Sequence, residues 1–262
     1  MLKKKSLGQH FLTSQHYVGM IADAANIAPN ETVLEIGPGE GALTRELLAR
    51  GANVVAIEKD RRLIPVLQET FAKEIAEERL LLIEADVLEF DPANVPGAGP
   101  YKLVANIPYY ITGAILEKFL SAKRQPQSAT LLVQKEVAER IAREKKESIL
   151  SLSVKAYGAP KYIKTVPAGA FSPPPSVDSA ILAVEEISRK NFSDEAHEKR
   201  FFELVHAGFA HKRKLLASNL ESTLGAGGQT VLERVGIPEK ARAEDIELTR
   251  WVRLSCLGEQ EG

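Results

Sequence analysis

The chain has 262 residues, 44% of them hydrophobic, and a formal net charge of −1. This length and composition fit one large α/β domain followed by a smaller one. The near-neutral charge excludes a globally basic nucleic-acid-binding protein, so any RNA-binding surface must be a local patch. The single cysteine, Cys256, excludes an intrachain disulfide and a cysteine-rich zinc site. We expect no metal centre, because His, Cys and Asp residues show no ligand spacing.

The N-terminus is basic, but only the apolar pair Phe11-Leu12 follows it, which is not a signal peptide. No uninterrupted apolar run is long enough to span a bilayer. We therefore expect a cytoplasmic protein with no membrane partner.

The elements predicted in chain order alternate between helix and strand. An extended, charged lead-in covers residues 1–13, and a helix follows over about 14–27 because apolar residues recur at helical spacing. Strands alternating with helices imply a parallel sheet with right-handed crossovers. The strands expected in this part are 32–36, 53–57, 80–84, 101–105 and 129–134, and one helix is expected from Asp60 to about Ala76.

The pattern changes in the second half of the chain. A helix is expected over 148–157, and strands over 161–166 and 180–184 complete the sheet. From about 188 onward only helical patterns remain, at 194–210, 212–224, 229–236 and 243–257. We therefore predict a catalytic domain over 1–187 and a small all-α domain over 188–262.

A glycine-rich loop directly follows the first of these sheet strands. Gly37, Gly39 and Gly41 would let a nucleotide-like ligand approach the backbone at a helix N-terminus. Glu58, at the end of the next strand, can accept hydrogen bonds from both ribose hydroxyls. The same pattern also fits NAD, so the loop by itself leaves two cofactors open.

Asp86-Val87, after the third sheet strand, favours S-adenosylmethionine (SAM) over NAD. Asp86 could bind the adenine amino group of that cofactor, with Val87 beside the ring. An NAD-dependent oxidoreductase would need a catalytic Tyr-Lys or His-Arg pair. Tyr109 and Tyr110 have no lysine four residues later, so the oxidoreductase is the weaker alternative.

The stretch Asn106-Ile107-Pro108-Tyr109 follows the fourth sheet strand, where open α/β sheets bind ligands. Asn106 offers an amide oxygen and amide hydrogens, and Tyr109 offers a flat face for a base. Pro108 stiffens the turn. Thr112 is expected to cap the next helix.

Together, the segment Glu35–Gly41, Glu58, Asp86 and the Asn106–Tyr109 stretch resemble SAM-dependent amino-methyltransferases. Their spacing resembles the rRNA adenine N6,N6-dimethyltransferases of the KsgA/RsmA type. Two more segments extend the resemblance: 8–12, which is similar to the N-terminal lid of that family, and 171–179, which is similar to its Phe-x-Pro-x-Pro-x-Val-x-Ser motif. The resemblance covers nearly the whole chain. It implies a Rossmann-like methyltransferase domain with a mostly parallel sheet, plus a small helical RNA-binding domain.

The resemblance also implies a role for each matching residue. Catalysis would use Asn106, Pro108 and Tyr109 around the target adenine, with Phe171 stacking on the other side of the base. The cofactor would be bound by His10, Leu12, Gly37, Gly39, Glu58, Asp86, Val87 and Asn106. His10 departs from the family pattern, where many members have asparagine.

The implied substrate is two adjacent adenines near the 3′ end of 16S rRNA in the small ribosomal subunit or its precursor. The basic run Lys212-Arg213-Lys214 is the candidate RNA contact. A monomeric enzyme is expected. Two further alternatives are the related 23S rRNA methyltransferases of the macrolide-resistance type, and a ribosome assembly factor that retains the cofactor pocket but turns over slowly.

Overall fold

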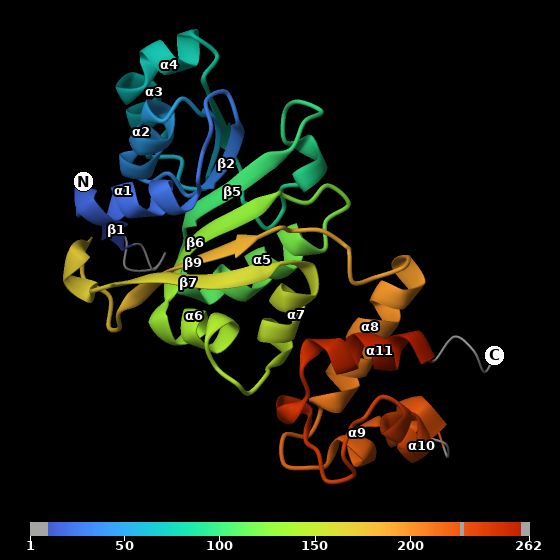
Figure 1. The fold of residues 1–262 in the computed structure, drawn as a ribbon. Helices are drawn as coiled ribbons and strands as arrows, with labels where there is room; N and C mark the ends of the chain where they lie inside the picture. The colour runs from blue at the N-terminus through green and yellow to red at the C-terminus, as the bar shows by residue number, and fades with distance from the viewer. Residues whose placement is uncertain (1–9, 226–227, 258–262) are drawn as a thin grey trace. The chain divides into compact units, whose positions relative to one another are not determined.

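The computed structural model describes residues 10–225 and 228–257. Residues 1–9 of the predicted lead-in therefore lie outside the described residues, as do residues 226–227 and 258–262. Two compact units make up the chain (Figure 1). The first contains the chain up to Ala138 and Gly158–Ile187, and the second contains Glu139–Tyr157 and the chain from Ser188 onward. One division therefore falls at 187/188, where the composition changes, but residues 139–157 group with the C-terminal helices.

The first unit is built on a seven-stranded sheet with the order β4-β3-β2-β5-β6-β9-β7. Strands β4, β3, β2, β5 and β6 are parallel to their neighbours, whereas β9 runs antiparallel to both β6 and β7. The predicted α/β architecture with a mostly parallel sheet is confirmed. The strands are β2 (Thr32–Ile36), β3 (Asn53–Glu58), β4 (Leu80–Glu84), β5 (Tyr101–Asn106), β6 (Ser128–Gln134), β7 (Ala159–Val166) and β9 (Ser179–Glu185).

The register of the parallel strands places their carboxyl ends at one edge. Ile36 of β2 is opposite Ile57 of β3 on one side and Ala105 of β5 on the other. After β2 the chain forms β3 on one side of β2, and it later returns to form β5 on the other side. The strand order therefore reverses direction at β2. Such a switch point is where open α/β sheets bind ligands.

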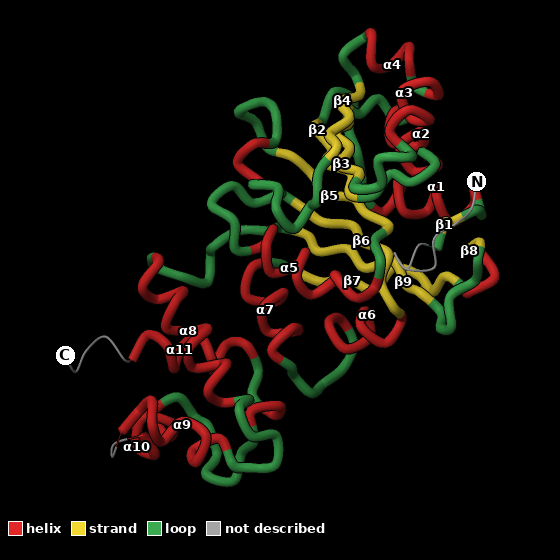
Figure 2. Tube along the Cα trace, turned by 180° about the vertical axis from the view of Figure 1, so that it is seen from behind, coloured by secondary structure: helices red, strands yellow, loops and turns green. Residues whose placement is uncertain are grey.

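Helices cover the sheet (Figures 1 and 2). The apolar face of α1 packs with α2 in a core cluster of buried side chains that includes Val18, Ile21 and Leu47. The helix predicted over residues 60–76 is instead two short helices, because Phe71 leaves the helical region at φ −115°. The helices are α1 (Gln15–Ala24), α2 (Ala42–Ala49), α3 (Ile64–Thr70), α4 (Ala72–Ala76), α5 (Thr112–Leu120) and α6 (Lys135–Ala142).

The helix predicted to be capped by Thr112 begins at that residue instead of after it. A 3₁₀ turn over Tyr109–Ile111 leads directly into α5, and Ile111 occupies the N-cap position. Tyr109, the first residue of this turn, lies three residues after the end of β5.

A short two-stranded ladder joins segments that are far apart in the sequence. β1 (Phe11–Leu12) runs antiparallel to β8 (Phe171–Ser172), with Leu12 opposite Phe171. Figure 2 shows the two strands side by side. The Thr13 backbone N–H also donates to the Ala170 carbonyl at 2.9 Å. The part of the lead-in that the structure describes is therefore fixed by pairing, which the sequence pattern did not predict.

The second unit is helical, with an aromatic core. Trp251 and Phe201 are fully buried, and Phe192 packs edge-on against Phe201 at a centroid distance of 5.3 Å. The predicted helix from 212 begins only at Leu216, so the basic run lies in the preceding turn. The helices are α7 (Ile149–Tyr157), α8 (Glu195–Gly208), α9 (Leu216–Leu224), α10 (Gly228–Arg234) and α11 (Leu248–Leu257).

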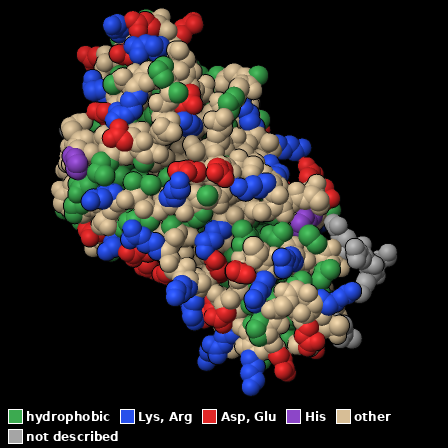
Figure 3. Space-filling view, in the orientation of Figure 1, with side chains coloured by type: hydrophobic (Ala, Val, Ile, Leu, Met, Phe, Trp, Pro, Cys, Tyr) green, Lys and Arg blue, Asp and Glu red, His purple; other side chains and the backbone are tan. Residues whose placement is uncertain are grey.

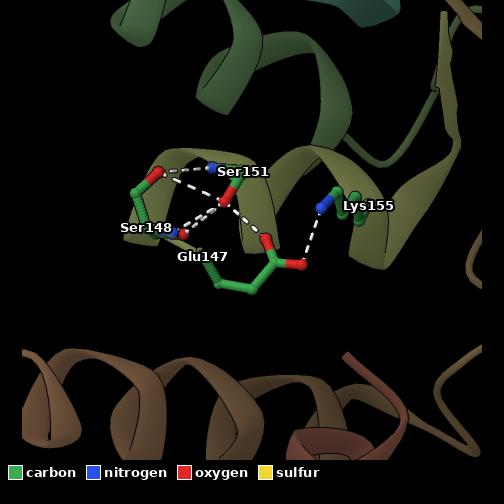
Figure 4. A network of polar contacts seen from close by, with 4 residues as sticks. All are labelled: Glu147, Ser148, Ser151 and Lys155. Carbon is green, nitrogen blue, oxygen red and sulfur yellow. Dashed lines mark hydrogen bonds and ion pairs between the residues drawn. The ribbon is translucent and has the colours of Figure 1, made fainter. Parts of the chain in front are cut away.

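A polar network fixes the start of α7 within the second unit (Figure 4). The Ser148 hydroxyl accepts from the Ser151 backbone N–H at 3.1 Å, and the Ser151 hydroxyl accepts from the Ser148 N–H at 2.7 Å. Both oxygens of Glu147 are used, one by Ser151 at 2.7 Å and the other by Lys155 at 2.6 Å. Reciprocal bonds of this kind satisfy the otherwise unpaired donors at a helix N-terminus.

None of the helices in the described residues is long and apolar enough to cross a membrane.

Candidate active site

A cavity of about 230 Å³ opens at the carboxyl edge of the parallel strands. The loops that follow β2, β3, β4 and β5 all contribute to its wall. Phe171 of β8, which is far from these loops in the sequence, also lines it. The predicted residues that line it are His10, Leu12, Gly37, Gly39, Glu58, Asp86, Val87, Asn106, Pro108, Tyr109 and Phe171. The structure therefore brings together all the residues predicted for cofactor binding and catalysis.

The glycine loop has the backbone that only glycine adopts readily. Gly37, Gly39 and Gly41 have φ values of +67°, +61° and +83°. A Cβ added to Gly37 would meet only the Asn106 carbonyl, at 3.7 Å, so the backbone there borders open space. At Gly41 an added Cβ would lie 2.4 Å from the buried Phe71 ring. The first glycine thus leaves room for a ligand, and the third permits packing beneath the loop.

Glu58 is held in place by backbone N–H groups of two loops, the one after β2 and the one after β3. One carboxylate oxygen accepts from the Gly39 N–H at 3.1 Å, and the other accepts from the Asp60 N–H at 2.8 Å. Each oxygen keeps further capacity to accept a hydrogen bond. Burial raises the pKa of the Glu58 carboxyl even though both backbone hydrogen bonds favour its ionised form. The side chain is therefore pre-positioned to receive hydroxyl groups.

Asp86 lies beside Val87 at the next strand end, and Lys59 contacts it. The Lys59 ammonium lies 2.6 Å from one Asp86 oxygen, and the Leu88 backbone N–H donates to the other at 2.9 Å. The hydrogen bond from Lys59 lowers the pKa of Asp86, so its carboxylate is ionised at neutral pH. The buried Val87 supplies an apolar wall beside this acceptor. Lys59 was not predicted as a site residue, because lysines are common on solvated surfaces.

Glu35 is a buried acid directly beneath the loop, and no role was predicted for it. The Thr44 hydroxyl donates to one of its oxygens at 2.7 Å, while the other oxygen has no partner among the described residues. Complete burial raises the pKa of Glu35 to about 8. A neutral carboxyl at physiological pH explains how the side chain is accommodated under the glycine loop, since a buried unpaired carboxylate would be far more costly.

Asn106 is the last residue of β5, and its side-chain amide makes no hydrogen bond with the residues that the structure describes. The Pro108 carbonyl accepts from the Ile111 N–H at 3.2 Å, whereas the Ile107 carbonyl accepts nothing from the described part of the chain. Two acceptors, the Asn106 side-chain oxygen and the Ile107 carbonyl, are thus available at one corner of the cavity. This is the arrangement needed to hold an amino group.

Aromatic side chains form the wall next to these acceptors. The rings of Tyr109 and His10 stack at a centroid distance of 6.3 Å and an angle of 18°, and the His10 Nδ1 lies 2.8 Å from the Pro173 carbonyl. Burial raises the pKa of the Tyr109 phenol, and its hydroxyl lies 2.6 Å from that of Ser179. Phe171 borders the cavity but is only 5% exposed, so its ring is also part of the core.

The basic run Lys212-Arg213-Lys214 lies in the second unit, between α8 and α9. All three side chains are exposed. The turn is closed by a hydrogen bond from the Lys214 N–H to the His211 carbonyl at 3.0 Å. Lys and Arg side chains are interspersed with Asp and Glu over the face in Figure 3. The positive electrostatic potential of a short basic run therefore extends only over its immediate surroundings.

Among the described residues, no group of three or more His, Cys, Asp or Glu side chains is arranged to hold a metal ion. The loop glycines, the Glu58 carboxylate and the ionised Asp86 do fit a ligand that has a ribose, an adenine amino group and an amino-acid tail. The donors are oxygen and backbone groups, which suit hydroxyl and amino partners.

The sequence matches the family described as Ribosomal RNA adenine dimethylase over residues 1–257. A "Ribosomal RNA small subunit methyltransferase A" of Dehalococcoides mccartyi is 43% identical over 97% of this chain and 87% of its own. One of Deinococcus radiodurans is 41% identical over 94% of this chain and 82% of its own.

Solved structures give the same picture at lower identity. A dimethyladenosine transferase from Plasmodium falciparum superposes with a TM-score of 0.79 at 26% identity, covering 94% of this chain and 96% of that one. The 23S rRNA methyltransferase ErmE superposes with a TM-score of 0.76 at 28% identity, covering 94% and 98%. The methyltransferase fold, the enzyme class and the methyl donor predicted from the motifs are confirmed. The chain belongs to the ribosomal RNA adenine dimethylase family.

Proposed function

We propose that this protein transfers methyl groups from SAM to the N6 amino groups of two adjacent adenines near the 3′ end of 16S rRNA. The observation that carries the proposal is the Asn106 amide at the end of β5, which has no hydrogen-bond partner among the described residues and lies in one cavity with Tyr109 and Phe171. Relatives at about 40% identity are named as small-subunit methyltransferases, which supports the choice of rRNA and a role in ribosome biogenesis.

The cofactor is assigned to the loop side of the cavity. Glu58 would accept from the ribose hydroxyls, Asp86 from the adenine amino group, and Val87 would lie against the adenine ring. Gly37 and Gly39 would let the amino-acid tail approach the backbone, with His10 and Leu12 closing the site from β1. When bound, SAM supplies an electrophilic methyl group on a sulfonium.

The target base is assigned to the aromatic side. An adenine amino group is a weak nucleophile because its lone pair is delocalised into the ring. The Asn106 side-chain oxygen and the Ile107 carbonyl, which Pro108 leaves without a competing donor, would accept its two hydrogens. Holding both hydrogens would direct the lone pair toward the methyl group, so alignment and electrostatics lower the barrier without a strong base. Tyr109 and Phe171 would provide faces for a base that has left its stack.

The experiment that tests this function uses labelled SAM with separated 16S and 23S rRNAs, small subunits and their precursors, followed by mapping of the modified base. We expect label at two adjacent adenines near the 3′ end of 16S rRNA in a small-subunit particle. Label confined to 23S rRNA would support the macrolide-resistance alternative, to which the ErmE structure is similar. Tight particle binding with negligible turnover would instead support the assembly-factor alternative.

The second unit is assigned to RNA binding through residues 212–214. Replacing all three by alanine should reduce the slope of log affinity against log salt by about 2–3, because three phosphate contacts are lost. The affinity for SAM should not change. A matched control removes the same net charge from exposed lysines elsewhere, namely Lys73, Lys161 and Lys199. An equal loss in both variants would assign the effect to net charge alone.

The proposal includes a monomer acting in the cytoplasm, where ribosomal particles assemble. Sedimentation of the pure protein tests the first point, and fractionation of cells that express it tests the second.

A further inference from the structure

Ser179 carries a buried hydroxyl that contacts Tyr109 of the active-site wall and that the function proposed above does not use. It is the first residue of β9 and is fully buried. Its backbone is paired on both sides, with Gln134 of β6 and Val166 of β7. Because β9 is hydrogen-bonded to a strand on each side, the backbone at Ser179 has little freedom to move, and its side chain is held in a fixed position.

The hydroxyl of Ser179 lies 2.6 Å from the phenol oxygen of Tyr109. Tyr109 is in a single 3₁₀ turn, its ring borders the cavity, and the His10 ring stacks with it at a centroid distance of 6.3 Å. A hydrogen bond to the phenol oxygen anchors the far end of the side chain, and so fixes the direction in which the ring points, which the turn alone would leave free. Burial keeps the phenol neutral, so a hydroxyl–hydroxyl bond can persist over the physiological pH range.

The preceding residue, Asp178, fixes the backbone turn that leads into Phe171, the other aromatic residue of the base site. Its side-chain oxygen accepts from the Ala168 N–H at 3.0 Å, and this fixes the 3₁₀ turn Ala168–Ala170 that leads into Phe171. Its carbonyl accepts from the Lys135 N–H at 3.0 Å, which ties it to the end of β6. Two consecutive residues thus connect both aromatic walls to one point of the sheet.

We propose that Asp178 and Ser179 are positioning residues that set where the Tyr109 and Phe171 rings lie relative to each other. This inference rests on the proposed function, in which the target adenine lies between those rings. Ser179 acts through the Tyr109 hydroxyl, and Asp178 acts through the backbone of the Phe171 turn. Neither residue needs to touch the base.

The test is a double-mutant cycle on single-turnover methyl transfer, with Ser179→Ala, Tyr109→Phe and the two combined. Loss of one buried hydrogen bond should slow each single variant by about 5- to 15-fold at subsaturating RNA. Because both changes break the same bond, the combined variant should be no slower than the slower single variant. The affinity for SAM, measured by calorimetry, should be unchanged in all three.

Two further variants separate positioning from folding. Ser179→Cys keeps most of the side-chain volume but is a weak hydrogen-bonding partner, so it should show the same rate defect as Ser179→Ala. Ser153→Ala is the matched control, because its hydroxyl donates to a carbonyl within α7 at 2.8 Å, and its rate should equal that of the wild type. A loss of melting temperature in the Ser179 variants without a rate defect would overturn the inference.

Additive losses in the cycle would also overturn it, because Ser179 would then act by another route than Tyr109. Failure of the proposed function gives a different result. If Tyr109→Leu, which removes the flat ring, methylates at the wild-type rate, the base does not lie on Tyr109 at all. If Tyr109→Leu is slow while Ser179→Ala and Tyr109→Phe match the wild type, the base site stands and only the positioning inference is wrong.

Discussion

The two sides of the cavity are built by different means. On the cofactor side, Glu58 and Asn106 lie at the ends of strands that are aligned with β2, so the sheet register brings them together. On the base side, Phe171 is held by a two-residue ladder with a strand 159 residues earlier in the chain. The cofactor side is therefore a consequence of the fold, whereas the base side depends on a few specific contacts.

This difference has an energetic consequence. The backbone that supports the cofactor side is shared with the core, so changes there should cost folding stability as well as binding. The base side is held by the separate two-stranded β1–β8 ladder and by single hydrogen bonds to the main sheet such as that of Ser179. Changes there should lower the methylation rate with a smaller effect on stability.

Asn106 joins the two sides, and its replacement should have the largest effect. Asn106→Ala removes the acceptor for the target amino group, so we expect a fall in single-turnover rate of roughly 10²–10³. Asn106→Asp keeps an oxygen of similar shape and should retain more activity than Ala. Its extra negative charge should strengthen ground-state binding of the cationic SAM without a matching gain in rate. If Ala and Asp are equally slow, the amide hydrogens matter more than the oxygen.

Gly41→Ala tests the claim that the cofactor side is part of the core. The added Cβ would lie 2.4 Å from the Phe71 ring, which is 2% exposed and cannot move aside. We expect a loss of about 2–4 kcal/mol in unfolding free energy, from overpacking and positive φ together. Gly97→Ala is the matched control, with φ +81° and nothing near the added Cβ. Urea denaturation measures both, and equal losses would remove packing from the explanation.

Glu35→Gln sharpens the comparison by testing the acid beneath the loop. The pKa of this carboxyl is near 4.5 in the unfolded chain, and burial raises it to about 8 in the folded protein. The unfolded state therefore holds fewer protons between these values, and wild-type stability should fall as the pH rises through this range. Glutamine, which cannot ionise, should be more stable than the wild type by about 4 kcal/mol at pH 8 and equal to it near pH 4.

The measurement for Glu35→Gln is urea unfolding at several pH values. Glu40→Gln is the control, because Glu40 is in the same loop but exposed. Parallel stability curves for wild type and Glu35→Gln would show that the buried carboxyl is ionised in the native protein.

Phe171→Leu should have the smallest effect on stability, because the leucine retains most of the apolar contact. We expect a loss of about 1 kcal/mol in unfolding free energy, together with about 1–3 kcal/mol of base stacking in RNA binding. Phe119→Leu, at a fully buried position of α5 outside the cavity, should cost similar stability without the RNA effect. If Phe171→Leu destabilises the protein as much as Gly41→Ala, the two sides do not differ in the way described.

Much of the cofactor side could be predicted from the sequence. Strand patterns alternating with helices imply parallel strands, and parallel strands place their carboxyl ends at one edge. Gly37, Glu58, Asp86 and Asn106 each follow such a strand, so their convergence required no knowledge of long-range contacts. The motif spacing then identified the family, and a match over residues 1–257 confirmed it.

The tertiary structure decided what depends on contacts between distant segments. The pairing of β1 with β8, the bond between Tyr109 and Ser179 and the burial of Phe171 join parts of the chain separated by 70 or more residues. The pKa of Glu35 depends on burial from all sides, and the charge of Asp86 depends on Lys59, 27 residues away. Local pattern and propensity contain no signal for such contacts, because they form only when the whole sheet has closed around the site.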